Sequence, residues 1–189
     1  MVVEARDSNK KYVDARSSLS KQKPSTGLKN VTLWKQQAID RILKDDELMK
    51  ILKYSSPDWY AKKDLTDFEK QEMYGSQVFP FKFVDNNIEE EKKSFISVDV
   101  AHFAPLEEFR LFSRKFIHGY LYFFILVDKD IMITDYGVRS DLIMGRIYDI
   151  FNNSRIGVGE MVLATNTPLA TDNNHYIGYS LGFKLAEIG

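Results

Sequence analysis

Apolar residues recur at helical spacing in the first third of the chain. Trp34, Ala38 and Ile42 follow one another at intervals of four residues, which places them on one face of a helix. The pattern predicts helical structure over residues 31–53. An acidic run at 45–47 interrupts this stripe and predicts that a second short helix begins there, because acids favour a helix N-terminus.

Two more helices are expected further along the chain. A capping box at 66–69 predicts a short helix that is stopped by Gly75. Isoleucines at helical spacing predict a longer helix over residues 139–152, with Ser140 or Asp141 as its cap.

Alternating and continuous apolar runs indicate strands in the second half of the chain. Residues 94–101 alternate, while the unbroken apolar run 119–127 predicts a central strand that is covered on both faces. Residues 160–165 and 176–185 predict a closing pair of strands. Pro80 keeps its extended stretch away from the centre of a sheet. The order of elements predicts an α+β fold, a mostly antiparallel sheet with helices packed on it.

The first 30 residues differ from the rest of the chain. They hold seven basic and three acidic residues, for a net charge of +4, and few apolar ones. Residues 1–30 are therefore predicted to be an extended N-terminal arm, and residues 31–189 a single α+β domain. The arm is either flexible or ordered by a partner subunit, in which case Tyr12, Val13 and Leu19 are its candidate anchors. Contact with nucleic acid is a weaker alternative.

The connection between His102 and His118 is longer than most loops, and loops of that length are often functional. It alternates apolar and charged side chains, a pattern that suits either a contact between subunits or a loop folded onto its own core. The candidate interface residues in it are Phe109, Arg110, Phe112, Arg114 and Phe116.

Composition narrows the classes of function. Apolar residues make up 44% of the 189 and charged residues 28%, as in ordinary globular proteins. The net charge of −1 argues against a protein that wraps nucleic acid. The chain has no cysteine, which excludes disulfides, thiol catalysis and cysteine-bound metals.

No apolar run is long enough for a membrane span, and the charged N-terminus does not resemble a signal peptide, so synthesis and use in the cytosol are expected.

No motif for a known chemistry stands out. Carboxylates that could bind Mg²⁺ or Ca²⁺ are Asp128, Asp130 and Asp135. They lack the spacing of an EF-hand loop, and a turn at a strand end explains them equally well. Asp99 with Lys115 or Lys129 offers an even weaker nuclease-like pair. The sequence therefore predicts no enzyme, no cofactor and no metal site, and favours a protein that makes contacts.

Several segments together resemble neck proteins of tailed bacteriophages, in particular the tail terminator or tail completion (head–tail joining) family. The resemblance covers residues 31–189 and is one of element order and texture. The segments that carry it are Val78–Phe81, Ser94–Val100, Gly119–Ile125, Arg139–Ile147, Phe151–Gly159 and the closing strands.

This resemblance implies a virion structural protein without enzymatic activity. Such proteins form a homo-oligomeric ring, commonly of six copies, at the head-proximal end of the tail. The ring ends the tail tube and contacts the tail tube protein and the head connector or other neck proteins. DNA passes through it without specific binding, and no membrane is involved. The expected location is the virion neck, after assembly in the host cytoplasm. Alternatives are a head–tail adaptor or stopper, or a small cytosolic protein-binding module.

Overall fold

The computed structural model describes residues 30–82, 92–105, 116–157, 159–171 and 175–188. The helices are α2 (Val31–Lys44), α3 (Asp46–Lys53), α4 (Asp67–Glu72) and α5 (Arg139–Phe151), with 3-10 turns η2 (Trp59–Ala61) and η4 (Lys129–Ile131). The strands are β1 (Val78–Phe79), β2 (Ser94–Pro105), β3 (Phe116–Asp128), β4 (Ile133–Thr134), β5 (Gly137–Val138), β6 (Val162–Ala170) and β7 (Tyr176–Ile188).

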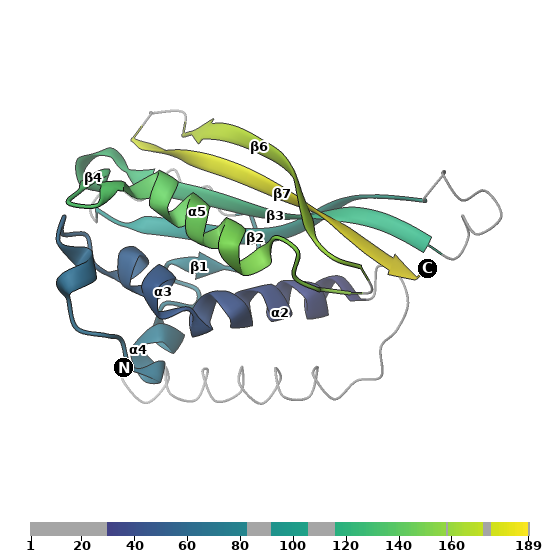
Figure 1. Ribbon diagram of the computed structural model, residues 1–189, viewed down its shortest axis with the longest axis horizontal. Coiled ribbons are helices and arrows are strands. Elements are labelled where there is room, and N and C mark those ends of the chain that lie inside the picture. The colour runs from purple at the N-terminus through teal and green to yellow at the C-terminus, as the bar shows by residue number, and fades with distance from the viewer. Residues whose placement is uncertain (1–29, 83–91, 106–115, 158, 172–174, 189) are drawn as a thin grey trace.

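Five of the strands form one sheet in the order β1-β2-β3-β7-β6. Every pair in it is antiparallel except β1 with β2. Figure 1 shows α5 lying along the strands, with α2 and α3 beside it. The α+β prediction is confirmed, and Pro80 directly follows β1, which lies at the edge of the sheet as expected.

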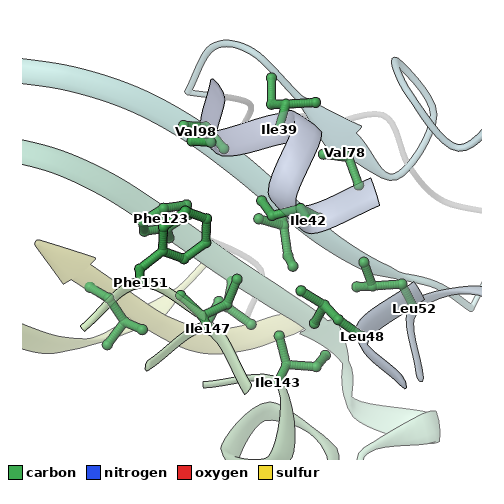
Figure 2. Packing of buried hydrophobic residues seen from close by; sticks show 14 of the residues in the cluster. Ile39, Ile42, Leu48, Leu52, Val78, Val98, Phe123, Ile143, Ile147 and Phe151 are labelled. Carbon is green, nitrogen blue, oxygen red and sulfur yellow. The ribbon is translucent and has the colours of Figure 1, made fainter. Parts of the chain in front are cut away.

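The core lies between the helices and one face of the sheet. The apolar stripes of α2 and α5 are buried as their spacing predicted. The rings of Phe123 from β3 and Phe151 from α5 lie 4.4 Å apart between their centroids, and Figure 2 shows them side by side. Ile143 and Ile147 continue this contact along α5.

Asp45 explains the break between the first two helices. Its carboxylate accepts a hydrogen bond from the Leu48 backbone N–H at 2.9 Å and so caps the start of α3. The same carboxylate receives two hydrogen bonds from Arg146 of α5, at 2.9 and 2.7 Å. The predicted interruption is confirmed, and its acid also ties α3 to α5.

The prediction that β3 is central is confirmed, and coverage of both of its faces is confirmed in part: Leu126, on the face away from the helices, is buried with Phe95 and Tyr176. Leu121, Phe123 and Ile125 are fully buried against the helices. Tyr120 and Tyr122, which point to the other face, are only partly buried. An unbroken apolar run cannot report which face the helices cover, because residues on both faces look equally apolar in sequence.

Several predicted boundaries also move. β2 extends to Pro105 and β3 begins at Phe116, so the connection between them is residues 106–115 rather than the whole stretch between the two histidines. β6 extends to Ala170, beyond the predicted end of this strand at residue 165. Pro168 is tolerated within it because β6 is an edge strand. Helix α5 has no side-chain cap from Ser140 or Asp141, since it already begins at Arg139.

Arg139 is the largest charged side chain in the core and is fully buried. Its five donors bind five backbone carbonyl oxygens at 2.7–3.1 Å, those of Ile131, Ile51, Tyr54, Ser55 and Ser56. These carbonyls include the C-terminal end of α3, where a cation is electrostatically favoured. Burial lowers the pKa of Arg139 to about 10, so the guanidinium still carries its charge at neutral pH.

We expect Arg139→Met to lower the free energy of unfolding by at least about 3 kcal/mol, because several buried carbonyls lose their donors. Chemical denaturation monitored by circular dichroism measures this change. The matched control is Arg155→Met, since the side chain of Arg155 is exposed and pairs with the exposed carboxylate of Glu160 at 3.2 Å. The control should shift stability by no more than about 0.5 kcal/mol. Equal effects of the two variants would contradict this role of Arg139.

Two glycines should respond oppositely to alanine. A Cβ at Gly178 of β7 would overlap the backbone carbonyl of Ile125, so Gly178→Ala should cost about 2–3 kcal/mol. A Cβ at Gly145 of α5 would meet no atom within 4 Å. Gly145→Ala should therefore stabilise the protein by about 0.5–1 kcal/mol through helix propensity. Thermal unfolding of both variants tests this, and a loss of stability in Gly145→Ala would contradict it.

Candidate subunit interface

Most of the interface residues proposed from sequence lie outside the described residues. These are Tyr12, Val13, Leu19, Phe109, Arg110, Phe112 and Arg114. Phe116 begins β3, where its backbone pairs with Ile188, and nothing is described of its side chain. Their role as an interface stays a prediction.

The described residues expose a different apolar surface at one end of the molecule. The short hairpin of β4 and β5 exposes 70% of Ile133, 50% of Tyr136 and 38% of Val138. Tyr60 of η2 is 53% exposed, and its ring centroid lies 5.5 Å from that of Tyr136. These four residues form what we call the end surface. Exposed apolar groups gathered in this way are typical of protein contact sites.

Buried Trp59 supports the end surface from below. Its ring makes edge contacts with Tyr60 and Tyr136, at centroid distances of 5.5 and 5.8 Å. The backbone N–H of Asp135 donates to the carbonyl of Pro57 at 3.2 Å, which fixes the hairpin to the segment that carries Trp59. Two segments more than seventy residues apart in sequence thus build one rigid aromatic cluster.

A groove of about 400 Å³ lies between α3 and α5 and shares Trp59 with the end surface. Its lining residues are Glu47, Leu48, Ile51, Trp59, Asp141, Leu142, Gly145, Arg146 and Asp149. The exposed acids Glu47, Asp141 and Asp149 surround an apolar floor that includes buried Leu48 and Ile51.

The one cation in the lining is already paired. Arg146 binds Asp45 through two hydrogen bonds, and this pairing raises the pKa of Arg146. Its Nε also lies 3.7 Å from a carboxylate oxygen of Glu47. The groove therefore has more acidic than basic groups and suits a basic, partly apolar ligand.

Two of the three acids considered as metal ligands, Asp128 and Asp130, have other partners, and the bond given for Asp135 is that of its backbone N–H to Pro57. Asp128 is buried, accepts a hydrogen bond from the Asp130 backbone at 2.8 Å, and lies 2.9 Å from Nε2 of His175. Asp130 pairs with Lys92 at 2.7 Å, and this pair lowers the pKa of Asp130. In the described part of the chain no group of three metal-binding side chains converges.

Asp99 pairs with a lysine other than the two considered from sequence, of which Lys115 lies outside the described residues. Asp99 accepts a hydrogen bond from Nζ of Lys35 on α2 at 2.5 Å, and another from the backbone of Val100 at 2.9 Å. The ion pair of Lys35 and Asp99 joins α2 to β2, which is a structural role for this acid.

Sequence reasoning missed the end surface, although a weak signal was present. Ile133, Tyr136 and Val138 put three large apolar groups in six residues between charged and glycine positions. Such a short run indicates neither a helix nor a long strand. Its exposure depends on how the hairpin sits on Trp59, which local sequence does not report.

The structure is a two-layer α+β domain with exposed apolar side chains at one end. A family model described as YomW matches residues 45–185, and the chain belongs to the YomW family. This family is phage-derived, of the SPβ-like prophage kind. Comparison with curated proteins and with solved structures finds no match. Among the described residues, no helix is both long and apolar enough to cross a membrane.

We expect millimolar Mg²⁺ or Ca²⁺ to leave the melting temperature unchanged within about 1 °C, because a ligand that binds the folded state would raise it. The reason is that Asp130 is held by Lys92 and Asp128 is buried beside His175. Differential scanning fluorimetry with and without each ion measures this. A metal-dependent rise that Asp130→Asn abolishes would instead establish an ion site.

Proposed function

We propose that this protein is a virion structural protein of the phage neck, of the tail terminator type. Six copies form a ring at the head-proximal end of the tail, where the ring ends the tail tube and joins it to the head connector. The observation that carries the proposal is the end surface, an exposed aromatic and aliphatic contact site on a chain of a phage-derived family.

A ring needs two different complementary patches on each subunit, because each copy contacts its neighbours head to tail. The end surface provides one such patch at one end of the domain. Its tyrosines are among the side chains enriched at protein interfaces, and Trp59 holds them in place before binding. Each subunit also needs a second patch, complementary to its neighbour.

The remaining properties of the proposed ring follow from this role. Its partners are the tail tube protein and the connector or other neck proteins, and its place is the virion neck after assembly in the host cytoplasm. DNA passes through without specific binding, in keeping with a net charge of −1. The role is structural rather than enzymatic.

The test is the solution mass by light scattering, with negative-stain images of the same peak. We expect closed rings with a central hole. Ile133→Glu places a charge in the end surface and should shift the mass toward the single subunit without lowering the melting temperature. A mass of one subunit at every concentration, also with tail tubes present, would contradict the proposal.

The matched control for this variant is Val162→Glu. Val162 is 52% exposed on β6, outside the end surface, and pairs across the sheet with Lys184, which accommodates an acid. This variant should keep the ring. Loss of the ring in both variants would show that the end surface is not the specific contact.

A further inference from the structure

We propose that the groove between α3 and α5 binds the basic N-terminal segment, residues 1–29, of a neighbouring copy of this chain. The inference rests on the proposed ring, since it requires a neighbour, and it assigns the second patch of the ring contact. The groove would hold apolar anchors of the segment on its floor and basic side chains at its acidic rim.

Charge is divided unequally between the segment and the rest of the chain. Residues 1–29 carry a net charge of +4, whereas the whole chain carries −1, so the remainder carries −5. The groove concentrates part of that negative charge in Glu47, Asp141 and Asp149. Opposite charges of this kind favour encounter and fix the register of a bound segment.

Gly145 leaves space in the groove, although glycine is unfavourable within helix α5. It lies in the interior of α5, where glycine costs about 1 kcal/mol relative to alanine. No neighbouring atom requires the missing side chain, because a Cβ there would meet nothing within 4 Å. The glycine lines the groove, so its lack of a side chain leaves room for an occupant.

Trp59 adds a donor that lacks an acceptor. Its indole Nε1 is buried and makes no hydrogen bond within the part of the chain that the structure describes. Leaving a buried donor unpaired costs about 1–3 kcal/mol. Because Nε1 itself is buried, a docked segment would contact the ring of Trp59, which lines the groove.

The sequence of the segment matches the floor as well as the rim. Tyr12, Val13 and Leu19 are apolar positions between basic residues. Leu48 and Leu142 line the groove together with the ring of Trp59. A peptide with apolar anchors flanked by lysine and arginine is the kind of ligand that an apolar groove with an acidic rim selects.

The segment begins at the end of α2 that lies away from the groove. It joins α2 at Asn30, whereas Asp45 links the other end of α2 to α3. The 14 residues of α2 put about 20 Å between these two ends, and Figure 1 shows α3 at the end of α2 opposite to its start. A segment of this length can span that distance to its own groove or reach a neighbouring copy. The head-to-tail contact of the proposed ring assigns it to the neighbour.

The absence of native cysteine allows a direct test in the full chain. One copy carries Tyr12→Cys, and a second copy with a longer tag carries Gly145→Cys. Mixed under mild oxidation, they should form a disulfide-linked heterodimer. The control pairs Tyr12→Cys with Val162→Cys on β6, outside the groove, and should give at least about fivefold less product. Salt at about 0.5 M should reduce the specific product, because it screens the charges at the rim.

A binding measurement tests the chemistry of the groove. A labelled peptide of residues 1–29 is titrated into the dilute full chain, with fluorescence anisotropy as the readout. Gly145→Leu fills the groove and should weaken binding by about tenfold or more, as should the double change Glu47→Gln with Asp149→Asn. Glu72→Gln on α4 removes an exposed acid outside the groove and should leave the affinity unchanged. Melting temperatures of all variants verify that each is folded.

The outcomes separate this inference from the ring itself. Rings without the cross-link between positions 12 and 145 would overturn the docking and leave the ring. A cross-link that forms only within a single chain carrying both cysteines would also overturn it. The heterodimer without any ring in solution would support the docking and overturn the ring. Equal weakening by Glu72→Gln and by the groove variants would overturn the assignment of the site.

Discussion

The structure depends on one buried cation. Arg139 places all five of its donors on backbone carbonyls, which belong to the end of α3, the loop after it and the 3-10 turn before α5. Residues 51–56, which are distant in sequence, and the turn at Ile131 are thereby fixed to the start of one helix. A guanidinium suits this place because its planar fork meets several acceptors at once, and the negative end of a helix favours its charge. Loss of the side chain would leave carbonyls buried without donors.

The surface features follow from the way that Arg139 and the Asp45–Arg146 pair hold α3 and α5. These two contacts set the space between the helices, and that space is the acidic groove. The same loop that receives Arg139 leads into Trp59, whose ring supports the tyrosines of the end surface. A rigid aromatic support lowers the entropy lost when a partner binds. The interactions that stabilise the core therefore also position the end surface and the groove.

The distribution of charge and apolar groups is consistent with the proposed role as an assembly subunit. The described acids that could suggest chemistry, Asp99, Asp128 and Asp130, are held in structural pairs. The acids that line the groove lie instead at its exposed rim, beside apolar side chains. The basic segment and the acidic groove belong to the same sequence, so the proposed recognition between copies would need no further partner. The chain itself belongs to a phage-derived family.

The sequence alone determined the features that depend on neighbours along the chain. The stripe of Trp34 and Ala38 and the capping box of Thr66 report local geometry, and each is present as predicted. The alternation of β2 predicted a strand there, but residues 94–98 are buried on both faces. Tertiary structure decided which apolar residues are covered. Helices cover Phe123 and leave Tyr122 partly exposed, although both belong to one apolar run. It also decided that Arg139 is core and that Tyr60 meets Tyr136. Periodicity fixes the face on which a side chain lies, whereas its burial depends on which distant segment packs against that face.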